Sequence, residues 1–185
     1  MKRTFIATKI HPGTQLLNAY AKLRNELENE KIKWVDPENF HLTLFFIGDT
    51  DEEQIDIIRQ ELASLTATYS KTHIQLEGLG VFKSIHKPRV LWAGISQYDE
   101  LKKIKIAIDQ RMEQFGFTPD KREFKPHLTL ARMKWIEDKQ KLNQILNEFK
   151  SLHFQESTIE DLILFESILK PTGPEYKPIE KFELH

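Results

Sequence analysis

The chain has 185 residues, the length of one ordinary domain, and 39% of them are hydrophobic, so it can bury a sizeable core. Its 27 basic and 28 acidic side chains give a net charge of -1, which excludes a surface that is basic all over but not a local basic patch. The lack of cysteine excludes disulfides, zinc ribbons and thiol nucleophiles. Lys9 interrupts the first apolar run and no stretch approaches the length of a membrane span, so we expect a soluble cytoplasmic protein.

Strands and amphipathic helices alternate along the first half of the chain. Thr50 and Glu53 have the spacing of a capping box and indicate where a helix begins. Gly78 and Gly80 lie within an apolar run and indicate a bulge or bend in a strand. The patterns predict strands over residues 4–10, 32–35, 40–47 and 73–82, and helices over residues 16–27 and 55–65.

The second half repeats this order. A short strand is expected to open at Phe117, after Gly116. The tail contains Pro174 and Pro178, so it is at best an edge strand. The patterns predict further strands over residues 90–95 and 126–133 and within 153–170, and helices over residues 101–115 and 142–149.

Each half therefore follows the order β-α-β-β-α-β, and the two halves share a frame offset by 86 positions. This offset places His41-Leu42-Thr43-Leu44 on His127-Leu128-Thr129-Leu130, and Arg3 on Arg89. We therefore predict an α+β fold in which one bilobal domain spans residues 1–185. Lobe 1 covers about residues 1–85 and lobe 2 about 86–185, with antiparallel-rich sheets lining a central cleft, helices outside, and a C-terminal tail that crosses back.

The repeated tetrapeptide carries the functional signal. Because strand side chains alternate, His41 and Thr43 share one face while the leucines share the other, and the same holds for His127 and Thr129. Two such faces around one cleft suit acid–base chemistry on a phosphodiester, since one imidazole takes a proton and the other donates one. The threonine hydroxyls suit the non-bridging phosphate oxygens.

Two other interpretations compete with this one. A single His-x-Thr in a strand is most simply a structural histidine, but a matched pair in an otherwise diverged frame favours function. A metal site needs three or four ligands, and the residue two positions beyond each histidine is threonine. We therefore expect no metal.

The chain resembles the 2H phosphoesterase superfamily, and within it the LigT-like RNA 2′,3′-cyclic phosphodiesterases, also called 2′-5′ RNA ligases. The resemblance runs nearly end to end. It is carried by Arg3–Ala7, Phe40–Gly48, Arg89–Gly94, Lys125–Arg132 and a closing segment, Ser167–Tyr176.

The resemblance implies hydrolysis of an RNA terminal 2′,3′-cyclic phosphate to a 2′-phosphomonoester, with a possible reverse reaction that joins RNA by a 2′-5′ linkage. It implies that His127 is the proton acceptor and His41 the proton donor, although the sequence does not establish which histidine has which role. It also implies that Thr43, Thr129 and Arg132 bind the phosphate, without a metal or other cofactor. The expected partner is RNA with a cyclic phosphate end, or a 2′,3′-cyclic nucleotide, bound by a monomer that contacts no membrane.

Three expectations depend on local geometry. Arg132 lies five residues after His127, so it reaches the phosphate only if the strand bulges or ends; otherwise it is a surface residue. Phe45 continues the His41 face and either stacks on a base or packs in an apolar region. Residues 121–134 are rich in basic side chains and either attract an RNA backbone or form a solvated loop.

Two alternatives to this function remain open. One is the same chemistry on a small cyclic nucleotide or a 2′-5′ oligonucleotide. The other is a non-catalytic module that binds RNA or nucleotides on this fold.

Overall fold

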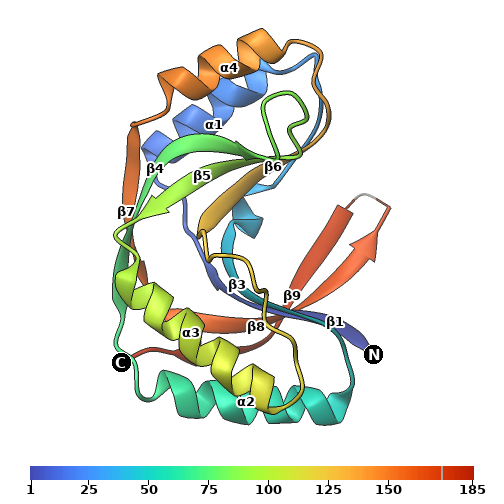
Figure 1. The fold of residues 1–185 in the computed structure, drawn as a ribbon, viewed down its shortest axis with the longest axis vertical. Coiled ribbons are helices and arrows are strands. Elements are labelled where there is room, and N and C mark those ends of the chain that lie inside the picture. The colour runs from blue at the N-terminus through green and yellow to red at the C-terminus, as the bar shows by residue number, and fades with distance from the viewer. Residues whose placement is uncertain (172) are drawn as a thin grey trace.

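The computed structural model describes residues 1–171 and 173–185, which form an α+β fold of four helices and nine strands in two antiparallel sheets (Figure 1). Thr172, within the expected closing segment, lies outside the described residues. The first sheet has the strand order β3 (His41–Thr50), β1 (Lys2–Lys9), β8 (Asp161–Lys170) and β9 (Gly173–Glu183). The second sheet has the order β2 (Lys31–Trp34), β6 (His127–Trp135), β5 (Val90–Ser96), β4 (Thr72–Phe82) and β7 (His153–Ile159).

The helices lie on the outer faces of the sheets (Figure 1). The second sheet is covered by α1 (Thr14–Glu26) and α4 (Lys139–Glu148), while α2 (Glu52–Thr66) packs on the first sheet and α3 (Asp99–Gln114) contacts both. One hydrophobic core runs beneath both sheets and includes Leu42 and Leu128, the leucines that follow the two histidines. We call the opposite face of each sheet, which carries the histidines, its inner face.

The two sheets interleave the halves of the chain. β2 and β4 come from the first 85 residues but pair in the second sheet, while β8 and β9 return to pair beside β1 in the first. Residue 85 is therefore not a boundary between the sheets. The edge-strand prediction for the tail is confirmed, since β9 lies at the end of its sheet.

Most predicted elements form, with two local differences. The short strand at Phe117 is absent from the described structure, because Phe117 and Phe124 pack against the core from a loop that pairs with no strand. The capping box of α2 lies one residue later than expected. Asp51 accepts a bond from the Gln54 N–H, while Thr50 is buried in β3.

Gly78 of β4 behaves as the sequence predicts, whereas Gly80 keeps regular pairing opposite Trp92. The register against β5 shifts between Glu77 and Leu79, so Gly78 forms a bulge with a φ of 68°.

None of the four helices formed by residues 1–171 and 173–185 has the length and apolar character needed to cross a bilayer.

Candidate active site

The two histidines are held by the same backbone contact. The Nδ1 atom of His41 lies 2.7 Å from the carbonyl oxygen of Asn39, and that of His127 lies 2.8 Å from the carbonyl oxygen of Lys125. Because a carbonyl oxygen only accepts, each Nδ1 carries a proton and donates it. Each neutral imidazole therefore keeps its lone pair on Nε2, the nitrogen left for chemistry.

Each histidine strand carries a bulge at the last leucine of the repeated tetrapeptide. Against β1, the partners change from Thr43 with Ala7 to Phe45 with Ile6, which leaves Leu44 as the extra residue. Against β5, the partners change from Thr129 with Trp92 to Ala131 with Leu91, which leaves Leu130 as the extra residue. A bulge shifts the alternation of side chains by one position, so both strands change phase at matching places.

The bulge in β6 turns Arg132 onto the inner face. Leu130 and Ala131 are consecutive core residues, each 0% exposed, and Arg132 then emerges on the face that carries His127 and Thr129. From the sequence, we expect Arg132 to share the His127 face only if the strand bulges or ends before it. The structure has such a bulge at Leu130.

Of the two interpretations left open for Phe45, the structure supports packing in an apolar region, because the bulge in β3 turns this residue away from the His41 face. Phe45 is buried in the core, where the Lys105 ammonium lies 5.6 Å from its ring centre. Phe46, which is 70% exposed, occupies the inner face instead. The offset of 86 that relates the two motifs makes Phe46 the counterpart of Arg132. The alternation rule missed Phe46 because a bulge leaves no clear signal in a short apolar run.

His41 lies among aromatic side chains. A second apolar cluster, separate from the main core, is formed by Phe5, Ala7, Ile163 and Phe165, with Tyr176 packed against it. The His41 ring centre lies 5.3 Å from that of Phe5 and 5.0 Å from that of Tyr176. Sequence reasoning did not select these residues, because they meet only when β8 and β9 return beside β1.

His127 has a different neighbourhood. Its ring makes an edge contact with Phe82 at 4.5 Å, and Phe82 lies 5.5 Å from Trp92. The Trp92 indole lies directly over Gly80, where a Cβ would come within 2.2 Å of the ring. Gly80 is therefore required for Trp92 to lie flat on the inner face beside Thr129, its partner across β5 and β6.

Burial lowers the pKa of both histidines, and the hydrogen bond to the backbone carbonyl opposes this shift in each case. The positive charge of Arg132 lowers the pKa of both histidines further, and the charge of His127 does the same to His41. The charge of Arg132 therefore lowers the pKa of one imidazole in each sheet. Each imidazole therefore binds a proton less readily than a free histidine does.

The five predicted site residues therefore occupy the inner faces of two strands, β3 and β6, which contact each other. Thr43 and Thr129 are half-buried, each on the same face as its histidine. Within residues 1–171 and 173–185, no group of three or more His, Asp or Glu side chains is placed to hold a metal.

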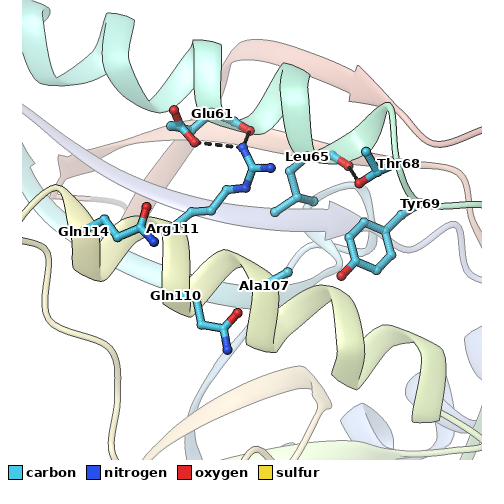
Figure 2. A pocket seen from close by; sticks show the side chains of 8 residues that line it. All are labelled: Glu61, Leu65, Thr68, Tyr69, Ala107, Gln110, Arg111 and Gln114. Carbon is cyan, nitrogen blue, oxygen red and sulfur yellow. Dashed lines mark hydrogen bonds and ion pairs between the residues drawn. The ribbon is translucent and has the colours of Figure 1, made fainter.

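A groove on the outside of the molecule is a separate feature (Figure 2). It lies between α2 and α3, and the Arg111 guanidinium spans it to reach the Glu61 carboxylate at 2.8 Å. One side of the groove is formed by α2, from the first half of the chain, and the other by α3, from the second half. No histidine lines it, so we do not assign it to the candidate site.

A family model described as LigT like Phosphoesterase matches the chain twice, over residues 10–92 and 95–176. Each match contains one of the two His-x-Thr motifs. Proteins named RNA 2′,3′-cyclic phosphodiesterase are similar along most of the chain. The one from Archaeoglobus fulgidus is 36% identical over 82% of this chain and 84% of its own length. The one from Methanocaldococcus jannaschii is 33% identical over 97% of this chain and 99% of its own length.

Solved structures share the whole fold. A crystal structure of a Thermus thermophilus protein has a TM-score of 0.81 at 26% identity, covering 98% of this chain and 97% of its own. A crystal structure of Escherichia coli LigT complexed with 3′-AMP has a TM-score of 0.76 at 19% identity, covering 99% of this chain and 98% of its own.

Proposed function

The chain belongs to the LigT-like phosphoesterase family, and we propose that it is an enzyme that hydrolyses the 2′,3′-cyclic phosphate at an RNA end to a 2′-phosphomonoester. The names of relatives that are 33–36% identical support this substrate class. The observation that carries the proposal is the matched pair of imidazoles. Each is anchored through Nδ1, and each is influenced by the charge of Arg132.

In the proposed reaction, Nε2 of His127 takes a proton from water as the water oxygen attacks phosphorus. The bond from phosphorus to the 3′-oxygen breaks, and Nε2 of His41, protonated in this state, gives its proton to that oxygen. The backbone carbonyl of Asn39 supports this role, because it accepts from Nδ1 whether or not Nε2 is protonated. The products are a 2′-phosphomonoester and a 3′-hydroxyl.

The phosphate is proposed to lie against three donors. The hydroxyls of Thr43 and Thr129 donate to the non-bridging oxygens, and the Arg132 guanidinium adds a charge-assisted bond. The anionic phosphate also offsets the effect of Arg132 on the two imidazoles, so it favours protonation of the proton donor when substrate binds. The same groups serve 2′-5′ ligation when the 5′-hydroxyl of a second RNA replaces water.

The aromatic wall beside His41, formed by Phe46 and Phe5, is proposed to hold the terminal nucleobase. Phe46 is exposed on the inner face, and its ring lies 6.1 Å from that of Phe5, so a base stacked on Phe46 continues an aromatic surface. This assigns the nucleoside to the first sheet and much of the phosphate binding to the second.

The test is product analysis with an oligonucleotide that ends in a 2′,3′-cyclic phosphate, incubated with a chelator and no added metal. We expect a single new product, the 2′-phosphate, which alkaline phosphatase converts to a free end. A 3′-phosphate product would contradict the assignment of the leaving oxygen, and an unchanged substrate would contradict the proposed function.

A further inference from the structure

A strip of cationic side chains extends from Arg132 to the outer edge of the second sheet. Lys33 is the register partner of Arg132 across β2 and β6, and Lys31 is the partner of Trp135. Directly paired residues of antiparallel strands share a face. Ile32 and Trp34 pack against the core, so Lys31 and Lys33 project from the inner face. We call Lys31, Lys33, Lys134 and Trp135 the basic strip.

The strip overlaps only the strand half of the basic stretch expected over residues 121–134. In the loop half of that stretch, two of the three cations are paired locally, because Arg122 binds Asp120 and lowers its pKa to about 2, and Lys125 lies 3.3 Å from Glu123. The strand half, which lies in β6, contributes Lys134 and Trp135 to the strip, and β2 contributes Lys31 and Lys33.

The lysines of the strip are not neutralised by the described residues. No carboxylate of residues 1–171 and 173–185 lies within 4.0 Å of the ammonium groups of Lys31, Lys33 or Lys134. Glu30 is the nearest acid in sequence, but its carboxylate accepts from the backbone N–H groups of Glu137 and Asp138. The three ammonium groups therefore have no carboxylate partner among the described residues, although the ammonium of Lys33 lies close to Gly173.

Trp135 adds an aromatic surface to this charge. Its side chain is 62% exposed at the end of β6, and the Lys139 ammonium lies 5.9 Å from its ring centre. An exposed tryptophan leaves apolar surface in contact with water, which is unfavourable unless a partner covers it. A flat aromatic ring among cations is the pairing that binds single-stranded nucleic acid, in which bases stack and phosphates meet lysines.

We propose that the basic strip binds single-stranded RNA on the 5′ side of the terminal nucleotide, so that the substrate is an oligonucleotide rather than a mononucleotide. This inference rests on the proposed function, because a cyclic phosphate held between the histidines leaves the chain only its 5′ side along which to extend. A second register shift, which leaves Lys134 as the extra residue against β2, brings Trp135 onto the face of Lys31 and Arg132, so it stacks a base upstream of the reacting end. The lysines contact the phosphates between them.

The experiment compares kcat/KM for a single-stranded oligonucleotide and a mononucleotide, both ending in a 2′,3′-cyclic phosphate. We expect the double variant Lys31→Gln, Lys33→Gln and the single variant Trp135→Ala to lower the ratio of oligonucleotide to mononucleotide kcat/KM. The ratio falls about fivefold or more for Trp135→Ala, the effect of losing one stacked base. The slope of log kcat/KM against log salt for the oligonucleotide becomes shallower by about 0.7 for each phosphate that a lysine no longer neutralises.

The matched controls lie on α3 and its end. Lys102→Gln removes the same charge from an exposed helical site, and Phe115→Ala truncates an exposed aromatic side chain. Neither control should change the ratio. A ratio that stays constant in the strip variants, or falls equally in the controls, would overturn the inference.

A binding measurement separates this inference from the proposed function. Fluorescence anisotropy with a labelled single-stranded RNA that ends in a 2′-phosphate requires no turnover. Weaker binding by the strip variants, with unchanged binding by the controls, supports the strip even if the wild-type protein hydrolyses neither substrate. Equal binding by all proteins, or equally strong binding of a blunt duplex with the same end, would reject a single-strand site.

Discussion

The two histidine strands have the same backbone geometry but different surroundings. His41 and His127 share the carbonyl contact, the bulge that follows and an aromatic neighbour. His41 lies beside the Phe5 and Tyr176 rings of the second apolar cluster, whereas the strand of His127 continues into Arg132 and the basic strip. The difference is sharpest at one pair of positions, where Phe46 in β3 corresponds to Arg132 in β6. The duplicated frame therefore keeps the same backbone geometry at both histidines, while the matching position is aromatic in β3 and cationic in β6.

The largest effects test the two histidines, which share the same backbone geometry. His41→Ala and His127→Ala should each lower kcat by about 10²- to 10⁴-fold, because each removes one proton-transfer group. The measurement is steady-state hydrolysis of a cyclic-phosphate RNA, with circular dichroism to verify folding. His153→Ala, at an exposed position in β7, is the matched control. Full activity in either site variant would mean that the twin motif is only a relic of duplication.

The next effect tests Arg132 as a donor to the phosphate. Arg132→Gln should lower kcat/KM by about a hundredfold, since this variant has one charged donor fewer to the phosphate. Arg132→Lys should recover part of that activity, because it restores the charge but not the planar pair of donors. If Lys and Gln at this position behave alike, the charge of Arg132 does not contribute to catalysis, and its placement on the inner face by the bulge has no catalytic consequence.

The aromatic wall should show a smaller effect. Phe46→Ala should lower kcat/KM by about fivefold or more, the cost of one stacked base. Phe46→Tyr should retain most activity, because the ring is kept. A Phe115→Ala control reports on the removal of an exposed aromatic side chain elsewhere. An equal decrease in the Ala and Tyr variants would argue against stacking.

The smallest effect is a shift of the pH profile, which tests whether the charge of Arg132 acts on both histidines. The reaction needs one protonated and one neutral histidine, so kcat/KM falls above the higher and below the lower of their two pKa values. Both pKa values are lowered by burial and by Arg132, so the maximum should lie below about pH 6.5, the ordinary histidine pKa.

Removal of the Arg132 charge should move this profile. In Arg132→Gln a positive charge that disfavours protonation is gone, so both pKa values rise and both limbs shift to higher pH. The measurement is kcat/KM against pH at constant ionic strength, with Lys102→Gln as the charge control. A profile that stays in place would show that Arg132 acts on the phosphate but not on the imidazoles.

Much of the site could be predicted because it depends on local pattern. The spacing of His41, Thr43, His127 and Thr129 predicts their faces by alternation alone, and the structure places each pair on one face. Phe45 could not be assigned in this way. A bulge changes the phase of a strand, and whether one forms depends on the partner strand, which the sequence of β3 does not contain.

The sequence by itself determined the α+β class, the duplicated frame and the two histidines, because periodicity and an exact repeat are properties of neighbouring residues. Tertiary structure alone decided which strands share a sheet, that Phe46 and Arg132 emerge on the inner faces, and that Lys31 and Lys33 join Arg132. These outcomes come from pairing between segments far apart in the chain. The net charge of -1 hides a basic strip for the same reason, since the strip is assembled from two strands about 100 residues apart.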